Sequence, residues 1–315
     1  MKIAITGANG FIGRHVVSEA LNQNFDVLAI TRQAKESYLA NFLVDHPETN
    51  IDRLDVRECN LYESKDINET LAGCDSVIHL AAAMEAGDDA HKKTLAITKN
   101  IIDGINHNNI KTLLLVSSIS VLDYIQQNAN ATIDEKTPLC NDDSAMGHYA
   151  IMKRDQEKLC QQWQRETGKQ LITVRPGLVY SDQQLSDSHA GFIKKGVGIT
   201  VKHEGQVPLI RVDQVGREIV LLLSHSVFAK DIFHSIGRPP ISQHDYLEQL
   251  KRQDILKFSL PLPWKTYDCL GQLIRWLLTK AKKEDKVPDS FKINSIAARQ
   301  KPFIFSSNKI SQLLK

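Results

Sequence analysis

The sequence predicts an α/β fold, with a doubly wound parallel sheet in its first half and a smaller lobe after it. Short apolar or β-branched runs alternate with longer amphipathic stretches, as a parallel sheet joined by crossover helices requires. Three closely spaced glycines, Gly7, Gly10 and Gly13, follow the first of these runs. The alternation loosens after Pro176, so a different architecture is expected beyond that residue.

The first half is expected to follow a β-α-β rhythm over six strands. The strands are expected at residues 2–6, 26–31, about 54–59, 76–80, 112–116 and 171–175. The helices between them are expected at 11–23, 35–46, 66–72, 88–107 and 145–167. A rhythm sustained this long indicates a doubly wound sheet.

The second half predicts a smaller lobe that lies against the carboxyl edge of this sheet. Its first part has polar loops around 181–190 and 202–208 and a helix pattern at 213–224. Two proline-containing breaks, at 239–240 and 261–263, separate helix patterns at 242–252 and 265–282. We therefore expect a first domain over 1–180 with 205–235 returning to it, and a lobe made of 181–204 and 236–315.

The composition excludes several classes of protein. The net charge of +2 is spread over 39 basic and 37 acidic side chains, which argues against nucleic acid as a partner. No apolar run reaches the roughly 18 residues of a membrane span, and Met1 leads directly into the first expected strand, so no signal peptide is expected. These features predict a cytoplasmic protein.

The cysteines predict neither disulfides nor a metal site. They are five in number, widely spaced and without a C-x-x-C pair, so reduced thiols are expected.

Two further segments receive structural interpretations. The charged run 280–286 is expected to be a solvated helix end. The apolar segment Leu260-Pro261-Leu262-Pro263-Trp264, followed by Leu270, Leu273, Ile274, Leu277 and Leu278, could touch a membrane surface, but core packing is the favoured interpretation.

The glycine-rich loop predicts a dinucleotide site. It reads Thr6-Gly7-Ala8-Asn9-Gly10-Phe11-Ile12-Gly13 and lies between the first strand and the first helix. Such glycines allow a tight turn and a close approach to a pyrophosphate, which the helix N-terminus then faces. The expected cofactor-binding residues of this Rossmann motif are Gly7, Gly10, Phe11, Ile12 and Gly13. Tight turns use the same glycines, so the position before a helix is what favours the dinucleotide.

The end of the second strand favours NADP over NAD. An acidic residue about 20 positions after the glycines would bind the ribose 2′-hydroxyl of NAD, but this chain has Thr31-Arg32 there. A guanidinium suits a 2′-phosphate. The alternative is that Arg32 only caps the strand in solvent.

Tyr149 and Lys153 are the candidate acid/base pair. They are four residues apart in Tyr149-Ala150-Ile151-Met152-Lys153, within a helix pattern, and therefore share one face. An ammonium beside a phenol lowers a pKa that starts near ~10 and makes the phenol usable near neutrality. A surface contact would also explain the pair.

Two serines follow the fifth expected strand. The apolar strand Leu113-Leu114-Leu115-Val116 ends in Ser117-Ser118, and open α/β sheets bind ligands at this end of their strands.

Together these motifs resemble the extended short-chain dehydrogenase/reductase family, in its NAD-dependent epimerase/dehydratase branch. The resemblance covers roughly residues 1–235. It rests on the glycine motif, His79-Leu80-Ala81-Ala82, Val116-Ser117-Ser118, Tyr149-x-x-x-Lys153 and Arg175-Pro176-Gly177-Leu178-Val179-Tyr180. It implies a Rossmann domain that binds NAD(P) and a smaller substrate-binding lobe, with a homodimer as a further possibility.

The resemblance also implies roles for individual residues. Tyr149 and Lys153 would serve both catalysis and cofactor binding, with Lys153 on the nicotinamide ribose. Ser118 would carry the catalytic hydroxyl, by the count back from Val121. The remaining cofactor contacts would come from Asn60, Leu61, Leu80, Ala81, Ala82, Pro176, Gly177 and Val179.

Three departures from the family pattern limit the function. The family's Val-Tyr-Gly segment reads Val121-Leu122-Asp123 here. Dehydratase members have an Asp-Glu pair where this chain has Ile119-Ser120, so water elimination is not expected. Thr94 stands where many epimerases place an asparagine.

Three functions remain open at this point. The first is hydride transfer at a carbinol or keto carbon of a nucleotide sugar, as an epimerase or a 4-keto reductase. The second is an NADP-dependent reductase or dehydrogenase of a non-sugar alcohol or ketone. The third is a dinucleotide-binding protein without catalysis, which the intact Ser118, Tyr149 and Lys153 argue against.

Overall fold

The computed structural model describes residues 1–32, 38–47, 49–63, 66–83, 88–225, 231–281, 287 and 291–313. The chain divides into two compact units. The first comprises Met1–Ser118, Met152–Pro176 and Val212–Ser235, and the second comprises Ile119–Ile151, Gly177–Arg211 and Ile236–Lys315.

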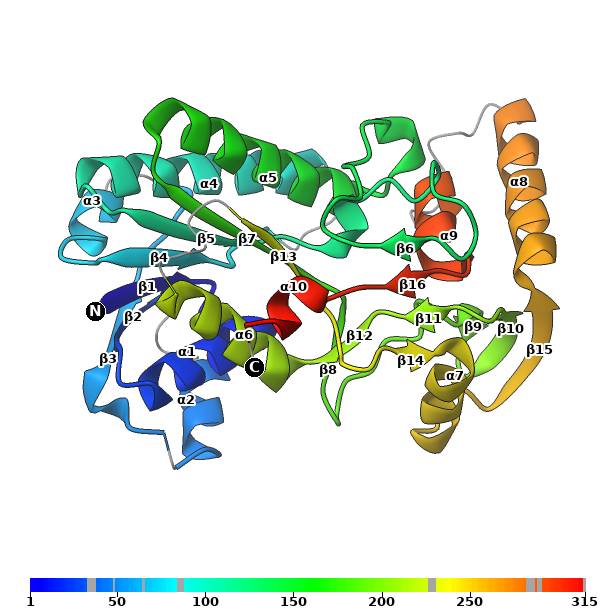
Figure 1. The fold of residues 1–315 in the computed structure, drawn as a ribbon, viewed down its shortest axis with the longest axis horizontal. Coiled ribbons are helices and arrows are strands. Elements are labelled where there is room, and N and C mark those ends of the chain that lie inside the picture. The colour runs from blue at the N-terminus through cyan, green and yellow to red at the C-terminus, as the bar shows by residue number, and fades with distance from the viewer. Residues whose placement is uncertain are drawn as a thin grey trace. The chain divides into compact units, whose positions relative to one another are not determined.

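The first unit contains a seven-stranded sheet with the order β13-β7-β5-β4-β1-β2-β3, seen in Figure 1. All neighbouring strands pair in parallel. The strands are β1 (Lys2–Thr6), β2 (Asp26–Thr31), β3 (Leu54–Glu58), β4 (Ser76–His79), β5 (Thr112–Val116), β7 (Gln170–Pro176) and β13 (Ile232–Ser235). This order is that of a Rossmann fold, so the predicted doubly wound α/β sheet is confirmed.

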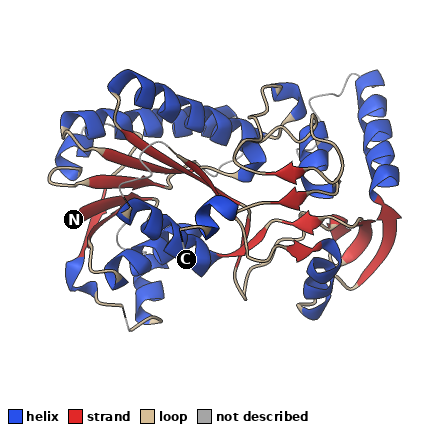
Figure 2. Ribbon diagram, in the orientation of Figure 1, coloured by secondary structure: helices blue, strands red, loops and turns tan. Residues whose placement is uncertain are grey.

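Helices cover both faces of this sheet (Figures 1 and 2). One face carries α3 (Ile67–Thr70), α4 (Asp88–His107) and α5 (His148–Thr167), and the other carries α1 (Phe11–Asn22), α2 (Tyr38–Val44) and α6 (Val212–Ser224). The central strands are buried on both sides, which explains their nearly continuous apolar sequences.

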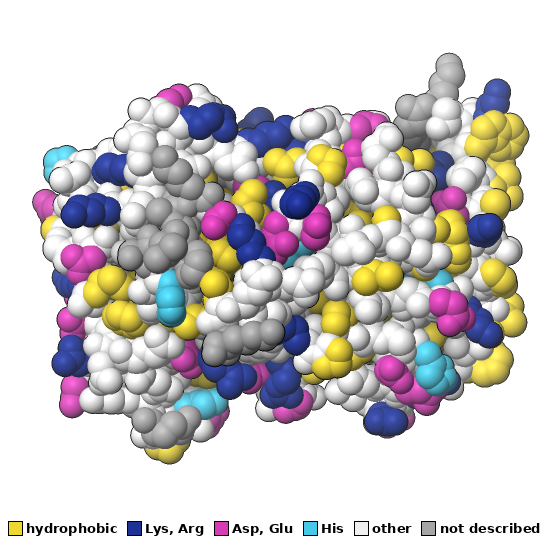
Figure 3. Space-filling view, viewed as in Figure 1, with side chains coloured by type: hydrophobic (Ala, Val, Ile, Leu, Met, Phe, Trp, Pro, Cys, Tyr) yellow, Lys and Arg dark blue, Asp and Glu magenta, His cyan; other side chains and the backbone are white. Residues whose placement is uncertain are grey.

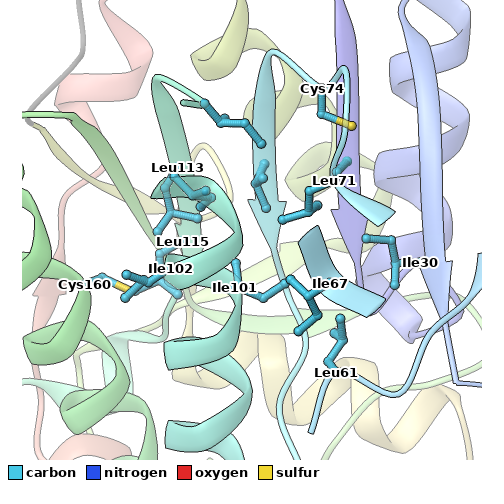
Figure 4. Packing of buried hydrophobic residues seen from close by; sticks show 14 of the residues in the cluster. Ile30, Leu61, Ile67, Leu71, Cys74, Ile101, Ile102, Leu113, Leu115 and Cys160 are labelled. Carbon is cyan, nitrogen blue, oxygen red and sulfur yellow. The ribbon is translucent and has the colours of Figure 1, made fainter. Parts of the chain in front are cut away.

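The core between the sheet and α3, α4 and α5 is mainly aliphatic, with three cysteines and Trp163 among its buried side chains (Figure 4). Ile67 and Leu71 interlock with α4, where a Cβ on Gly104 would lie 2.5 Å from Ile67 Cγ2. Each fully buried aliphatic side chain stabilises the fold by about 1.5–3 kcal/mol. This packing holds α4 and α5 against the strands that end at the candidate site.

The seventh strand, β13, is a difference from the six strands that the sequence predicts. It pairs in parallel with β7 from Ile232↔Thr173 to Ser235↔Pro176. Half of its residues, His234 and Ser235, are polar although buried, so its sequence lacks an apolar run. The Ser235 hydroxyl donates to Glu218 on α6 at 2.5 Å, and this bond compensates the burial.

The second unit is built from small sheets and four helices among its described residues. The sheets are β15-β10-β9, β11-β14, β12-β8 and β16-β6. The strands are β6 (Thr132–Ile133), β8 (Leu178–Tyr180), β9 (Gly191–Lys194), β10 (Val197–Lys202), β11 (Gln206–Val207), β12 (Leu209–Arg211), β14 (Ile241–Ser242), β15 (Phe258–Pro263) and β16 (Ile304–Phe305). The helices are α7 (Gln243–Arg252), α8 (Trp264–Lys280), α9 (Ile293–Gln300) and α10 (Asn308–Ser311).

The second unit takes in three segments that the sequence interpretation assigns to the first domain, residues 119–151, 177–180 and 205–211. Residues 119–151 pack with the C-terminal part, because β6 pairs with β16 and Asn294 bonds both Leu122 and Tyr124. Residues 205–211 are included because β11 pairs with β14 and β12 with β8. These pairings join segments far apart in the sequence, which local patterns do not reveal.

The prediction that the apolar residues of 260–278 pack in the core is wrong for several of them. Leu260, Leu270, Leu273 and Leu277 are exposed, whereas Leu262, Ile274 and Leu278 are partly buried. Only one side of α8 packs on the chain, through Tyr267 and Gly271. Residues 282–286 of the charged run lie outside the described residues.

Within the described part of the chain, no helix has the length and apolarity needed to cross a membrane. All five cysteines are free thiols.

Candidate active site

The glycine loop forms a tight turn at the end of β1. Gly7 has a φ of +69°, which favours glycine, and its carbonyl accepts a 2.9 Å bond from the Gly10 N–H. A Cβ on Gly13 would lie 2.1 Å from the Gly7 oxygen. Gly10 is the N-cap of α1 and provides no side-chain hydrogen bond. The first N–H groups of α1, at Phe11, Ile12 and Gly13, therefore suit a phosphate, so the loop fits a dinucleotide pyrophosphate.

The loop after β4 lies against this turn. A Cβ on Gly7 would be 3.0 Å from the Ala81 nitrogen. The Ala81 N–H donates to Thr6 Oγ1 at 3.2 Å, and the Ala81 carbonyl accepts from Gln156 Nε2 at 3.3 Å. Leu80, Ala81 and Ala82 are partly buried. The structure thus brings Leu80–Ala82 next to the glycine turn, as a shared cofactor site requires.

Arg32, Asn60 and Leu61, the residues proposed to contact the adenosine end of the dinucleotide, differ from one another in their surroundings. Arg32 is exposed directly after β2, and residues 33–37 lie outside the described ones. The Asn60 side chain accepts from the Tyr62 N–H at 3.2 Å. Leu61 is buried in the core beneath α3 and α4. A contact from Leu61 would therefore come from its backbone.

Lys153 is a buried cation among the polar side chains between α5 and the ends of β1, β4 and β5, which we call the polar core: Thr6, His79, Thr98, Ser117, Lys153, Gln156, Glu157 and Arg175. Its side chain is only 5% exposed, and its Nζ donates to the Val116 carbonyl at 2.9 Å and to Gln156 Oε1 at 3.0 Å. Burial lowers the pKa of Lys153 to about 8. The ammonium is therefore the main form only below about pH 8, and any function that needs this charge declines as the pH rises through that value.

Gln156 connects Lys153 to a buried histidine. The Gln156 amide N–H₂ lies 2.9 Å from Thr98 Oγ1 and 3.2 Å from His79 Nε2. His79 Nδ1 is 2.8 Å from Thr6 Oγ1. His79 Nε2 also lies 3.0 Å from Thr98 Oγ1, so both ring nitrogens have polar contacts. Burial, with a smaller effect of Lys153, lowers the pKa of His79 to about 3, so the ring stays neutral.

The two serines after β5 differ in their environment. Ser117 is buried, and its hydroxyl donates to Glu157 at 2.8 Å. Glu157 also binds the buried Arg175 through Nη2 at 2.5 Å and Nε at 3.2 Å. Ser118, the next residue, is partly exposed. Ser117 is therefore buried beside the Glu157–Arg175 pair, whereas Ser118 is the more exposed of the two serines and remains the candidate for contact with substrate.

The comparison with protein families decides the identity. The profile of the NAD-dependent epimerase/dehydratase family matches residues 3–228, most of the chain. The chain belongs to this family.

Relatives of this epimerase/dehydratase chain include reductases and sugar epimerases. It is 22% identical over 281 residues to the bifunctional dihydroflavonol 4-reductase/flavanone 4-reductase of Malus domestica, covering 84% of this chain and 80% of the relative. The crystal structure of gox2253 has a TM-score of 0.74 at 19% identity and covers 99% of this chain and 92% of that one. The UDP-glucuronic acid 4-epimerase of Bacillus cereus, in complex with UDP-glucuronic acid and NAD, has a TM-score of 0.68 at 18% identity, with 100% and 93% covered. At these identities the solved structures establish the fold.

The other proposed residues of this family member are distributed over both units. Tyr149 is 44% exposed and lies one helical turn before Lys153 on α5. Pro176 ends β7 and is buried. Gly177 packs closely on the Pro208 carbonyl, which a Cβ would approach to 2.0 Å. Val179 lies in β8, paired with Ile210. Thr94 accepts from the Ala83 N–H and donates to Met152 Sδ, so its hydroxyl has structural partners.

Several residues of this polar core were not assigned a role from sequence: Thr6, His79, Gln156, Glu157 and Arg175. Helical spacing offers one signal, because Gln156 is one turn after Lys153 and therefore on the same side of α5. For Glu157 and Arg175 there is no comparable signal, although Arg175 stands in the Arg175–Tyr180 motif, because their pairing depends on the contact between α5 and β7.

Ser118 should be the serine whose loss affects turnover most. Ser118→Ala is expected to lower kcat about tenfold or more, as expected for a lost hydrogen bond to a developing charge. Ser120→Ala should change it little. Ser117→Ala should instead lower the thermal midpoint, because it leaves Glu157 without one buried donor. Steady-state kinetics and thermal unfolding of the three variants provide the measurements, and a larger kinetic loss at Ser120 would contradict the assignment.

Proposed function

We infer that this chain is an NAD(P)-dependent enzyme that transfers hydride at a carbinol or keto carbon of a nucleotide sugar, as an epimerase or a 4-keto reductase. The observation that carries the proposal is Lys153. It is a buried ammonium held by two neutral acceptors, the Val116 carbonyl and the Gln156 amide oxygen. An unneutralised buried charge is costly for stability, and such groups are typical of functional sites.

The bound nicotinamide supplies the hydride chemistry, and the chain supplies position and proton transfer. The α1 N-terminus and the Gly7 turn bind the pyrophosphate. Lys153 donates to the nicotinamide ribose and stabilises the phenolate of Tyr149 by its charge. Tyr149 moves the proton at the substrate oxygen, and Ser118 orients that oxygen. These roles support a reversible oxidation of an alcohol without a metal ion.

The substrate class rests on the likeness to sugar-nucleotide enzymes. The Bacillus cereus neighbour is described with UDP-glucuronic acid and NAD. The absence of the acidic pair at Ile119-Ser120 disfavours water elimination, which needs an acid and a base at that point. A reductase of a non-sugar ketone is the second candidate, favoured by the Malus domestica relative, whose name describes two 4-reductase activities.

One assay distinguishes these reactions. Under the epimerase proposal, a UDP-hexose is converted to its 4-epimer without added reductant, and native mass spectrometry of the purified protein shows a retained NAD. Under the reductase proposal, NADPH is consumed only when a 4-keto sugar nucleotide is added. Consumption of NADPH with a phenolic ketone but not with the sugar nucleotide would overturn the sugar assignment.

Arg32 is proposed to select NADP. A guanidinium that binds a 2′-phosphate contributes about 1.5–3 kcal/mol, or roughly ten- to a hundredfold in affinity. Arg32→Ala should therefore weaken NADP binding by that factor and leave NAD binding nearly unchanged, as measured by calorimetry. The control variant is Arg53→Ala, because Arg53 forms an exposed pair with Asp26. Arg14→Ala is unsuitable as a control because Arg14 packs over Phe11 in the glycine loop. A wild-type preference for NAD would favour the epimerase.

A further inference from the structure

Helix α8 is apolar on two different sides. At about 100° per residue, Tyr267, Gly271, Ile274 and Leu278 form one stripe, and these residues are buried or partly buried. This stripe packs on α9, where a Cβ on Gly271 would lie 2.7 Å from Ile296 Cδ1. Lys265, Asp268, Gln272 and Thr279 form a narrow polar stripe. The remaining arc should be polar in a helix that faces only water.

The remaining arc of α8 is apolar and exposed. It contains Leu270, Leu273, Trp276 and Leu277, which are 37%, 50%, 55% and 52% exposed. Their spacing of three and four residues places them side by side on the helix. The exposed Thr266, Cys269 and Lys280 lie on the same arc. The helix thus presents a second apolar face that its own chain does not cover.

The sheet β15-β10-β9 continues this apolar surface. Phe258 lies directly opposite Val197, and Leu260 lies opposite Ile199, which in turn faces Phe192. Residues paired across strands, and residues two apart in one strand, share a face. Phe192, Val197, Phe258 and Leu260 are each more than half exposed. Helix α8 follows β15 without a break, and Figure 3 shows hydrophobic side chains gathered where Figure 1 places α8 and β15.

The charges around this apolar surface are almost all positive. Residues 191–202 and 255–281 contain seven basic side chains, Lys194, Lys195, Lys202, Lys257, Lys265, Arg275 and Lys280, against one acidic side chain, Asp268. The whole chain has a net charge of only +2, so the positive charge is concentrated here. Lys265 and Lys280 lie over the rings of Trp264 and Trp276. Apolar residues, tryptophan and lysine together are typical of helices that lie in a membrane interface.

We propose that the surface formed by α8 and the β9-β10-β15 sheet binds the enzyme to the surface of an anionic lipid bilayer. The exposed leucines, phenylalanines and Trp276 enter the boundary between headgroups and acyl chains, and the lysines contact lipid phosphates. A second copy of the chain fits less well, because a symmetric contact through this surface would bring its six exposed lysines against the same six. The proposal is independent of the reaction assigned above.

Cys269 allows a direct test on the full-length protein. It is exposed on the apolar arc of α8, whereas the other four cysteines are buried. A polarity-sensitive maleimide dye on Cys269 should shift to shorter wavelength with vesicles of equimolar phosphatidylglycerol and phosphatidylcholine, and much less with phosphatidylcholine alone. Raising the salt concentration from about 0.1 M to about 1 M shortens the Debye length from about 10 Å to about 3 Å, so it should weaken binding.

Two charge variants on α8 form a matched pair. Leu273→Glu places a carboxylate in the exposed apolar arc and should reduce the vesicle partition coefficient about tenfold or more, measured by co-sedimentation. Thr279→Glu adds the same charge on the polar stripe and should change it severalfold less. Lys280→Gln should reduce it about fivefold, the effect of one lysine at an anionic surface. Because Leu273 and Thr279 are exposed, dinucleotide binding and thermal unfolding should be unchanged in both Glu variants.

Three results would overturn the proposal. The first is equal binding to anionic and neutral vesicles, and the second is equal loss in the two Glu variants. In the third, the protein does not sediment with vesicles but forms a dimer in analytical ultracentrifugation, and Leu273→Glu dissociates that dimer. This result would assign the surface to self-association.

Discussion

Replacing Tyr149 by phenylalanine is expected to lower kcat by about a hundredfold or more, which is the loss typical of a removed acid/base group. Phenylalanine keeps the ring and removes only the hydroxyl, so the fold should be unaffected. Affinity for the dinucleotide should also be nearly unchanged, since the pyrophosphate cradle lies at Gly7 and α1. The measurements are kcat with the substrate that is turned over in the assay described under Proposed function, and the dissociation constant of the dinucleotide.

A matched control separates this effect from a general response to the loss of a phenol. Tyr267→Phe removes a buried hydroxyl on α8 and should leave kcat within about twofold, the scale of a neutral substitution. Lys153→Met should behave differently from Tyr149→Phe, because it removes the cation that contacts both Val116 and Gln156. Lys153→Met should weaken dinucleotide binding and lower kcat together. Full activity of Tyr149→Phe would exclude the proposed mechanism.

Glu157→Ala is expected to reduce the free energy of unfolding by about 3–5 kcal/mol, because it leaves a buried charge without its partner. The Glu157 and Arg175 side chains are 0% and 3% exposed. Glu157 also accepts from the Ser117 hydroxyl at 2.8 Å and from Gln161 at 3.0 Å. Urea denaturation followed by circular dichroism measures the change, which should exceed that of any Tyr149 variant.

The charge explanation can be tested within the same pair. The double variant Glu157→Leu with Arg175→Met replaces both charges by apolar groups and should recover most of the lost stability. Asp213→Ala breaks the exposed pair with Arg217 and should cost less than about 1 kcal/mol. A double variant as unstable as Glu157→Ala would indicate that the cost comes from packing.

Much of the first unit is determined locally and was therefore readable from sequence. Strands β1, β2, β4, β5 and β7 are rich in apolar residues, because both faces of a parallel sheet are covered. The glycine turn was readable because a tight turn before a helix needs residues without a Cβ. The spacing of Tyr149 and Lys153 was readable because helical geometry alone places them one turn apart.

The surroundings of these residues were decided by tertiary structure. Gln156 joins Lys153 to His79, and His79 precedes Gln156 by 77 positions in the sequence. Glu157 meets Arg175 only because α5 packs on β7. The polar strand β13 and the pairing of β6 with β16 likewise depend on partners far along the chain.

The apolar residues of α8 show the same distinction. The sequence alone predicts a helix at about 265–282, because hydrophobic spacing depends only on neighbours along the chain. It could not determine which apolar side the chain would cover. In the structure α9 covers the stripe through Tyr267 and Gly271, and Leu273 and Trp276 remain exposed. Periodicity encodes the local conformation, whereas burial depends on which distant segments complete the contact.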